Sequence, residues 1–167
     1  MKIHTVILAA GEGSRMLSNK AKSLQPVGGL SMLRRIFDTV SNLTDETSFV
    51  VGFEKDSVIN EIEKFSGINH ICDQKKPIGT ADAVKSALDS IKQNSKVLVL
   101  YGDVPLIKES TLKNLLSLTK DSLTILTTEL DDPFGYGRVK KDIGVIASQV
   151  SINLHGSREA ASAKQSV

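Results

Sequence analysis

The 167-residue chain has the length of one globular domain, with 40% hydrophobic and 24% charged residues. A net charge of +2 and an aromatic content of 4% argue against a nucleic-acid partner. No apolar run approaches the ~18 residues of a membrane span, and residues 1–4 lead into an apolar segment without a cleavage-site pattern, so we expect neither a membrane partner nor a signal peptide. The single cysteine, Cys72, excludes an internal disulfide and fits a cytoplasmic location.

Short apolar runs alternate with helical patterns along the chain. Apolar strands are predicted at 3–9, 47–51, 68–72, 96–100 and 123–128. Helical spacing of apolar residues predicts helices at 31–40, 56–65, 80–91 and 110–118. Strands that are apolar throughout and alternate with helices are typical of βαβ units and a parallel sheet buried on both faces. The predicted fold class is therefore α/β, with a Rossmann-like, doubly wound, mostly parallel sheet.

In such sheets the ligand site lies beyond the carboxyl ends of the strands, here after Ala9, Cys72 and Tyr101. The first of these segments, residues 8–16, reads LAAGEGSRM. Gly11 and Gly13 let the backbone turn sharply and bring its N–H groups close to an anion. The small side chains of Ala9 and Ala10, directly after Leu8, leave room for a base or a ribose.

Two cations follow these glycines. Arg15 can hold phosphate oxygens with two donors at once, and Lys22 supplies a point charge for another phosphate. The segment lacks the Walker A spacing, and Met16 stands where the dinucleotide motif has its third glycine. The alternative interpretation is a glycine turn with a surface arginine and lysine.

A polar loop follows the third predicted strand. The amide of Gln74 offers a donor and an acceptor to the edge of a base. Gly79 and Thr80 begin the next predicted helix. The alternatives are an exposed loop residue for Gln74 and a helix cap for Thr80.

Another candidate site follows the fourth predicted strand. The carboxylate of Asp103 suits Mg²⁺, although it could instead cap the turn before Pro105. Tyr101 lines the same loop, where Gly102 permits close approach of a ligand. Further on, Gly137 lies in a Gly-Tyr-Gly turn whose backbone could bind sugar hydroxyls, with a plain hairpin turn as the alternative.

Four segments resemble, in order, the blocks of sugar-nucleotide pyrophosphorylases. They read LAAGEGSRM at 8–16, QKKPIGTADA at 74–83, YGDVPLI at 101–107 and DDPFGYGR at 131–138. Together they are most similar to the N-terminal pyrophosphorylase domain, a MobA-like nucleotidyltransferase domain, of bacterial bifunctional UDP-N-acetylglucosamine pyrophosphorylase/glucosamine-1-phosphate acetyltransferases. The resemblance covers residues 3–141.

The resemblance implies the nucleotide-diphospho-sugar transferase fold and a uridylyltransferase of cell-wall biogenesis (peptidoglycan and lipopolysaccharide). Its partners would be UTP and a hexosamine 1-phosphate, N-acetylglucosamine 1-phosphate, with Mg²⁺ as cofactor. It implies catalytic roles for Arg15 and Lys22 and a metal-binding role for Asp103. The nucleotide-binding residues would be Leu8, Ala9, Ala10, Gly11, Gly13, Lys22, Gln74, Gly79 and Thr80. The substrate-binding residues would be Tyr101, Gly102, Asp103 and Gly137.

The resemblance ends near Arg138. Ser151 stands where the family has a glutamate that contacts the sugar, and the family's Asn-Thr-Gly strand, second metal ligand and acetyltransferase domain have no counterpart in the sequence. We therefore expect residues 1–141 to form the nucleotide-binding part, residues 142–167 to form a divergent, poorly ordered tail, and the sheet to be incomplete at its C-terminal side.

This departure leaves three functional hypotheses. The first is a truncated uridylyltransferase that retains UTP binding better than catalysis. The second is a related nucleotidyltransferase that acts on molybdopterin or another sugar phosphate. The third is a non-catalytic nucleotide-binding remnant, which self-associates or needs a complementing chain because a sheet without its last strands exposes an edge.

Overall fold

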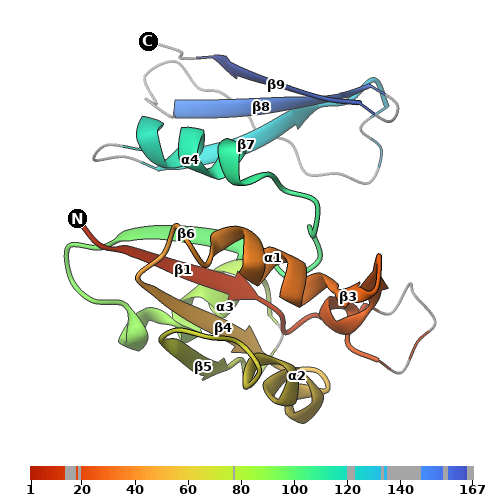
Figure 1. The fold of residues 1–167 in the computed structure, drawn as a ribbon, viewed down its shortest axis with the longest axis vertical. Helices are drawn as coiled ribbons and strands as arrows, with labels where there is room; N and C mark the ends of the chain where they lie inside the picture. Colours follow the sequence, from red (N-terminus) through yellow and green to blue (C-terminus); the bar gives the residue numbers. More distant parts are fainter. Residues whose placement is uncertain are drawn as a thin grey trace. The chain divides into compact units, whose positions relative to one another are not determined.

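The computed structural model describes residues 1–13, 18, 20–76, 78–119, 123–132, 134, 148–155 and 158–164. The chain divides into two compact units, Met1–Lys108 and Glu109–Val167. Figure 1 shows the helices and strands of both units. Within the described residues, no helix has the length and apolar character needed to cross a membrane.

The first unit is built on a four-stranded sheet with the order β5-β4-β1-β6 (Figure 1). Its strands are β1 (Ile3–Leu8), β4 (Glu46–Val51), β5 (Asn69–Asp73) and β6 (Lys96–Tyr101). All neighbouring pairs are parallel, and His4 of β1 lies opposite Glu46 on one side and Val97 on the other. The chain proceeds from β1 through β4 to β5 and then crosses back to place β6 on the other side of β1. The predicted doubly wound α/β class is confirmed, and its switch point lies between β1 and β6.

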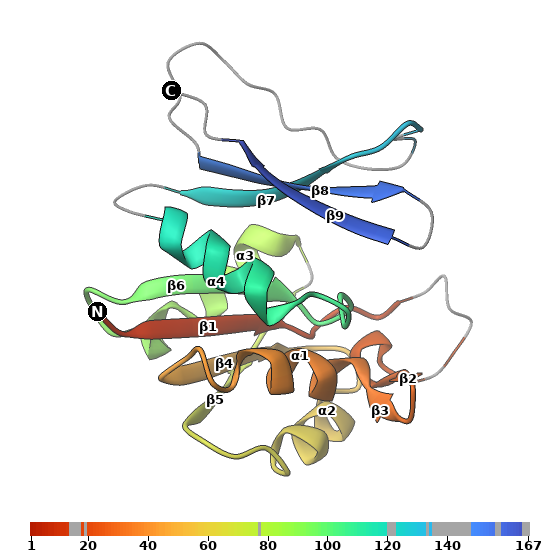
Figure 2. The same cartoon turned by 45° about the horizontal axis from the view of Figure 1, so that its top comes forward.

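Helices cover both faces of this sheet. They are α1 (Met32–Val40), α2 (Lys55–Ile62), α3 (Thr80–Ser86) and the short 3₁₀ helix η3 (Leu88–Ser90). Phe49 of β4 packs against Phe37 of α1 and Phe65, with ring centroids 6.1 and 5.7 Å apart. The next residue, Val50, points to the opposite face and packs in a cluster with Ala83 of α3. Figures 1 and 2 show α1 and α3 on opposite sides of the sheet.

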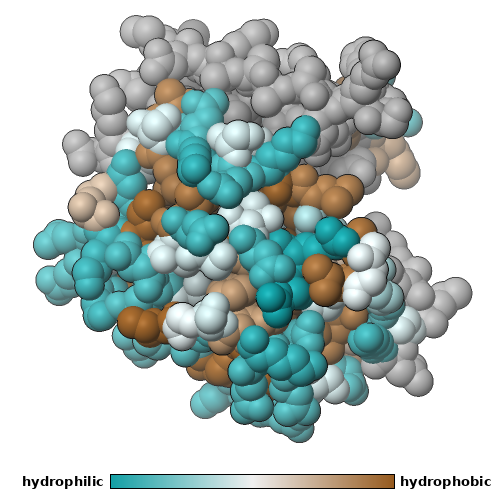
Figure 3. Space-filling model, viewed as in Figure 1, coloured by the Kyte–Doolittle hydropathy of each residue, from teal (hydrophilic) through white to brown (hydrophobic). Residues whose placement is uncertain are grey.

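Burial of both faces explains the apolar strands of the sequence. β4 is buried at every position, as expected for a central strand of a parallel sheet. β6 differs, because Leu98 and Leu100 are buried whereas Val97 and Val99 are 43% and 39% exposed. On the side that carries α1 and α2, the surface of the first unit is mostly hydrophilic with separated apolar areas (Figure 3). The helices thus place their apolar sides on the sheet and their polar sides in solvent.

A short hairpin precedes α1 and was not predicted. The 3₁₀ helix η2 (Lys22–Leu24) leads into β2 (Pro26–Val27), which pairs antiparallel with β3 (Leu30–Ser31). The two turn residues, Gly28 and Gly29, have φ values of 56° and 84°. Two consecutive left-handed residues are what a two-residue hairpin turn requires, so the Gly-Gly pair was the available signal in the sequence.

Ser31 fixes the start of α1. Its Oγ accepts a hydrogen bond from the backbone N of Arg34 at 3.0 Å, which is the contact of a helix N-cap. The same hydroxyl donates to Oε1 of Glu61 in α2 at 2.6 Å and lowers the pKa of that carboxyl, together with Lys64. The predicted helix at 31–40 therefore begins one residue later, because its first residue is used as the cap.

A buried polar cluster closes the amino end of the sheet. Glu46 is 5% exposed, and its two carboxylate oxygens contact Lys92 and, at 3.0 Å, His70. Hydrogen bonds from Lys92 and then His70 lower the pKa of Glu46 to about 2. Nε2 of His4 lies 2.7 Å from Oγ of Ser48, and burial, followed by the charge of His70, lowers the pKa of His4. These groups are satisfied by one another.

The second unit contains a helix and a separate three-stranded sheet. Its elements are α4 (Glu109–Leu118), β7 (Thr124–Glu129), β8 (Ser148–His155) and β9 (Arg158–Lys164). β7 and β8 pair in parallel, and β8 and β9 pair antiparallel. The predicted strand at 123–128 is present as β7, and β8 and β9 lie within residues 142–167, for which poor order stays a prediction. The division at residue 141 into a nucleotide-binding part and a tail stays a prediction.

Candidate functional site

A pocket of about 940 Å³ opens at the carboxyl end of the first unit's sheet. The segments that end or follow its four strands line this pocket, at 8–12, 52–55, 73–75 and 101–103. Its other lining residues are Lys22, Ser23, Gly79, Thr80 and Ala83. The position follows the rule for doubly wound sheets, and the volume lies in the range of known ligand pockets.

Most of the residues selected from the sequence meet in this pocket. Those that line it are Leu8, Ala9, Ala10, Gly11, Lys22, Gln74, Gly79, Thr80, Tyr101, Gly102 and Asp103. Gly13 lies beside it, because a Cβ built on Gly13 would be 2.7 Å from Cβ of Lys22. Arg15 and Gly137 lie outside the described residues. The roles assigned to all of these residues stay predictions.

The loop after β1 is anchored to the neighbouring strand. The backbone N of Ala9 donates to O of Val50 at 2.8 Å, and the backbone N of Phe53 donates to O of Ala10 at 3.2 Å. Gly13 has a φ of 68°, a conformation that favours glycine. Gly11 is exposed, and a Cβ on it would meet nothing within 4 Å. The loop therefore has a fixed base and an open tip, which suits a backbone anion site.

Lys22 and Asp103 form an ion pair in the pocket. Nζ of Lys22 donates to Oδ2 of Asp103, and the two side chains are 34% and 33% exposed. The residues are 81 positions apart in the sequence and meet because η2 passes the end of β6. The predicted cation for phosphate and the predicted metal ligand are thus direct neighbours. Each neutralises the other until a ligand contacts them.

Gly102 has a structural role besides the one predicted. Its predicted role, to allow close approach of a ligand, stays a prediction; in addition, Gly102 is buried, and its backbone N donates to O of Leu8 at 2.8 Å. A Cβ on Gly102 would lie 2.7 Å from O of Leu8 and 3.3 Å from Cα of Ala9. Gly102 therefore allows the end of β6 to pack on the end of β1, and this contact forms part of the pocket wall. Tyr101 beside it is 52% exposed.

Gln74 is a polar residue of the pocket that is nearly buried and makes three hydrogen bonds. Its backbone N donates to O of Val51 at 2.9 Å, and the residue as a whole is only 9% exposed. Nε2 donates to O of Gly79 at 3.2 Å and to Oδ2 of Asp82 at 3.0 Å. The interpretation of Gln74 as an exposed loop residue is therefore wrong. Thr80 is the first residue of α3, and no side chain caps this helix, so the cap interpretation of Thr80 is also wrong.

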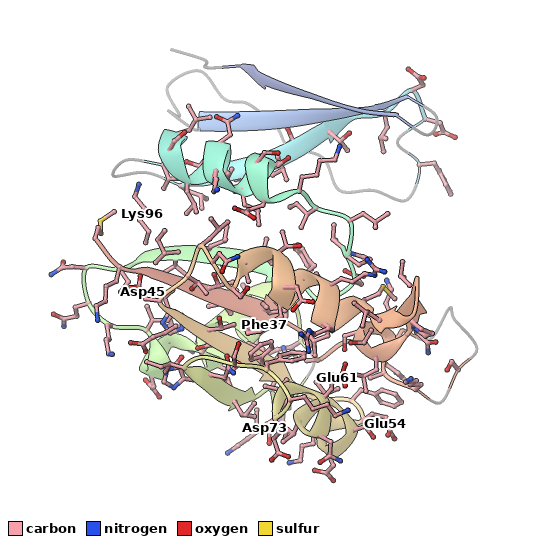
Figure 4. All side chains as sticks on the ribbon, viewed as in Figure 1. Phe37, Asp45, Glu54, Glu61, Asp73 and Lys96 are labelled. Carbon is pink, nitrogen blue, oxygen red and sulfur yellow. The ribbon has the colours of Figure 1, made fainter. Side chains whose placement is uncertain are left out.

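The loop after β4 was missed by the sequence analysis. Gly52, Phe53, Glu54 and Lys55 line the pocket, and Nζ of Lys55 lies 3.2 Å from Oδ2 of Asp73. Glu54 has a φ of 51°, an uncommon conformation for a residue with a side chain. Figure 4 labels Glu54 and Asp73 near α2 and the end of β5. The rule that pointed to the ends of the other strands applies equally to Val51, so this signal was available.

The pocket also contains side chains to which the sequence analysis assigned no role: Glu12, Ser23, Lys75 and Ala83. Oγ of Ser23 is buried and has no hydrogen-bond partner among the described residues. Asp103 places a carboxylate in the pocket, its role as a metal ligand stays a prediction, and within the described ranges no group of three or more His, Cys, Asp or Glu side chains could hold a metal ion. A divalent cation here would need oxygen ligands from a bound molecule.

Comparison with known proteins identifies the family. The MobA-like NTP transferase domain family matches residues 5–138. The chain is 46% identical over 142 residues to the "Bifunctional protein GlmU" of Ruthia magnifica subsp. Calyptogena magnifica, which covers 84% of this chain and 31% of that protein. The chain thus spans about a third of the length of the curated relatives that it matches.

Two solved structures illustrate the similarity of fold. HddC from Yersinia pseudotuberculosis, complexed with GMP-PN, aligns with a TM-score of 0.67 and 24% identity over 86% of this chain and 65% of that one. The 4-diphosphocytidyl-2C-methyl-D-erythritol synthase from Anaerococcus prevotii aligns with a TM-score of 0.63 and 26% identity over 79% of this chain and 57% of that one.

Proposed function

Because the chain belongs to the family of MobA-like NTP transferase domains, we propose that it is the nucleotide-binding part of a uridylyltransferase. Its substrates would be UTP and N-acetylglucosamine 1-phosphate, and its products UDP-N-acetylglucosamine and pyrophosphate. The 46% identity to a bifunctional GlmU protein supports this choice within the family. We place the reaction in the bacterial cytoplasm, as a supply of nucleotide sugar for the cell wall.

The observation that carries the proposal is the composition of the pocket. A glycine loop, a lysine, an aspartate and a buried glutamine amide converge at the switch point of a doubly wound sheet. The loop and Lys22 are suited to phosphates, whereas Gln74 is suited to the edge of a base. A nucleoside triphosphate combines these two chemistries in one ligand.

In the proposed reaction, an oxygen of the sugar phosphate attacks the α-phosphorus of UTP in line. The new P–O bond forms as the bond to the β-phosphate oxygen breaks, and pyrophosphate leaves. Such a transfer depends on positioning and on neutralisation of charge, so the protein needs no nucleophile of its own. Lys22 would stabilise charge at the α-phosphate, and the loop with Gly11 would bind the leaving phosphates. We propose that Arg15 also binds the leaving phosphates, because it belongs to the same motif at residues 8–16.

The residues present fit a magnesium ion only together with the nucleotide. Mg²⁺ is commonly held by one or two carboxylates and by substrate phosphates, and Asp103 offers one half-exposed carboxylate next to the phosphate loop. The ion would neutralise charge on the phosphates. Lys22 must release or share the Asp103 carboxylate when the ion and the nucleotide bind, because the two side chains are paired.

The nucleotide side of the proposed site and its sugar side differ in how well the chain matches the family. The matched relatives are about three times as long. The sugar-binding role of Gly137 is a proposal about a residue outside the described part of the chain, and Ser151 stands where the family has a glutamate that contacts the sugar. Because a serine cannot replace the carboxylate of that glutamate, we propose that UTP binding is retained and that catalysis by the chain alone is weak, with self-association or a complementing chain as the means of supplying the missing contact.

Calorimetric titration of the protein with UTP and Mg²⁺ tests the binding step. Saturable binding of UTP is the expected result, and CTP, GTP and ATP serve as the comparison. Absence of any heat with UTP, under conditions where the protein is folded by circular dichroism, would reject a uridine nucleotide site. Preference for another nucleotide would instead support a related nucleotidyltransferase with a different substrate.

A pyrophosphate-release assay tests the chemical step. With UTP and N-acetylglucosamine 1-phosphate we expect slow or absent release by the chain alone. Turnover at the rate of a full-length relative assayed in parallel would refute the loss of catalysis. Release with a different sugar phosphate would correct the second substrate without affecting the nucleotide assignment.

A further inference from the structure

The side-chain amide of Gln74 is held in one orientation. Its Nε2 lies 3.2 Å from the carbonyl oxygen of Gly79 and 3.0 Å from Oδ2 of Asp82. Both partners accept hydrogen bonds, and neither the carbonyl nor an ionised carboxylate donates one. If the amide were turned over, Oε1 would face two oxygens without a proton between them. The contacts therefore assign the nitrogen to the interior, although amide orientation is otherwise ambiguous.

This arrangement leaves Oε1 as the atom that can meet a ligand. Both protons of Nε2 have an acceptor, and the side-chain hydrogen bonds of Gln74 to described residues are made through Nε2, which leaves Oε1 for a ligand. Gln74 lines the pocket and is 9% exposed, so only a small part of the side chain is accessible. The pocket thus presents a fixed acceptor at this position.

We infer that Asp82 is a positioning residue for base selection, which rests on the proposed function of the pocket as a nucleotide site. Asp82 keeps Oε1 of Gln74 directed at the base and so favours a base with a donor at the facing position. Uracil carries such a donor at N3–H, whereas N3 of cytosine is an acceptor and would face Oε1 unfavourably. Together with the carbonyl of Gly79, the carboxylate thereby favours the one orientation of the amide that reads a donor on the base.

Other contacts help the Asp82 carboxylate to hold the Gln74 side chain in position. The backbone of Gln74 is fixed by O of Val51 at 2.9 Å, so the side chain starts from a defined position. Asp82 lies in the first turn of α3, where the orientation of the peptide dipoles favours a negative charge. The presence of an acid at position 82 could be explained by its interaction with the helix dipole alone. That explanation does not account for the hydrogen bond between Asp82 and the Gln74 amide.

The variant Asp82→Asn tests the inference with little change in shape. An asparagine amide can donate as well as accept, so only the carbonyl of Gly79 still requires Nε2 to face inward, and the orientation that presents Nε2 to the base becomes less unfavourable. We expect the ratio of UTP affinity to CTP affinity, measured by calorimetry with Mg²⁺, to fall roughly 3- to 10-fold. General destabilisation would weaken both nucleotides alike and leave this ratio unchanged.

Asp89→Asn is the matched control. Asp89 is an exposed acid of η3 that does not line the pocket, so the variant loses the same charge without touching Gln74. Its UTP to CTP ratio should equal that of the wild type. A wild type that binds UTP, with the same ratio in Asp82→Asn and Asp89→Asn, would overturn the positioning role and leave the proposed function intact.

A second measurement does not depend on nucleotide binding. In ¹⁵N spectra of the full chain without ligand, the Gln74 side-chain NH₂ signals should shift in Asp82→Asn and stay in place in Asp89→Asn. Unmoved signals in both variants would overturn the inference. If the wild type binds no uridine nucleotide, the proposed function and base selection both fail, and the NH₂ signals alone decide whether Asp82 orients the amide.

Discussion

The two ends of the parallel sheet contain similar charged groups in different surroundings. At the amino end, Glu46 is 5% exposed and is held by Lys92 and His70. At the carboxyl end, the side chains of Lys22 and Asp103 are 34% and 33% exposed and line a large pocket. In the first cluster the carboxylate is buried and paired at both oxygens, although Lys92 is 61% exposed, whereas in the second the carboxylate itself is accessible and can exchange its partner for a ligand.

The exposure of the carboxylate distinguishes an ion pair that supports the fold from one that can bind a ligand, and this distinction needs no sequence motif. A half-exposed pair contributes little to stability because water competes with each partner. Removing one partner of a buried carboxylate lowers the stability of the fold, because the charge that remains is left without a partner. Substitutions at the carboxyl end should therefore alter binding, and substitutions at the amino end should alter the free energy of unfolding and its dependence on pH.

Removal of the Lys22 side chain should give the largest effect. In Lys22→Ala, we expect UTP affinity measured by calorimetry to fall roughly 10- to 100-fold, because hydrogen bonds to charged groups contribute about 1.5–3 kcal/mol. The free energy of unfolding in urea should change by less than about 1 kcal/mol. Lys20→Ala removes the same charge from an exposed residue that does not line the pocket. Equal losses of affinity in both variants would show a general charge effect and contradict a specific contact.

Gly102→Ala should destabilise the pocket wall. The added Cβ would lie 2.7 Å from the carbonyl oxygen of Leu8, so the ends of β6 and β1 must separate. We expect the free energy of unfolding, measured in urea, to fall by about 1–3 kcal/mol. Gly11→Ala is the control for stability, because its Cβ would meet nothing within 4 Å. Equal stability of the two variants would contradict the close approach of the strand ends.

Acid should weaken the closed end through Glu46. Its pKa is lowered from 4.5 to about 2 in the folded chain, so the unfolded chain binds the proton more readily. The contribution of Glu46 is therefore present above pH 4.5 and is lost as the pH falls from 4.5 toward 2. Urea unfolding at a series of pH values measures this loss. Glu46→Gln should flatten the fall in that window, and an unchanged pH dependence would contradict the cluster.

His4 should add a weaker dependence at higher pH. Burial lowers its pKa below 6.5 in the folded chain, so stability falls as the pH drops below 6.5 and the unfolded chain takes up a proton. His4→Gln removes this titrating group while retaining a side chain that can contact Ser48. The variant should lose the part of the pH dependence that begins near pH 6.5. Persistence of that part in His4→Gln would assign it to another group.

The pair of Lys55 and Asp73 at the rim of the pocket should give the smallest effect on stability. Its nitrogen and oxygen are 3.2 Å apart, and the two side chains are 49% and 46% exposed. Lys55→Ala should change the free energy of unfolding by less than about 0.5 kcal/mol, measured in urea at low and high salt. A larger change that persists in high salt would show that this pair is more than a solvated contact.

Much of the fold was predictable because its signals are local. The predicted strands at 3–9, 47–51 and 96–100 differ from β1, β4 and β6 by one residue at an end. The predicted helix at 80–91 is instead α3 followed by η3, because the apolar spacing continues through a short 3₁₀ turn. The Gly28-Gly29 hairpin and the loop after β4 were missed although the sequence contained a signal for each. Local pattern fixes which segments become strands and leaves their exact ends to packing.

The α/β class and the order of the main strands and helices follow from the pattern of residues alone. So does the gathering of Lys22, Gln74 and Asp103 at one end of the sheet, because parallel strands bring their carboxyl ends together. Which of these groups are in contact with one another depends on the tertiary structure. Lys22 and Asp103 are paired across 81 positions, and Asp82 holds the amide of Gln74. Hydrogen bonds depend on distances of a few tenths of an ångström, and the packing of helices on the sheet sets these distances.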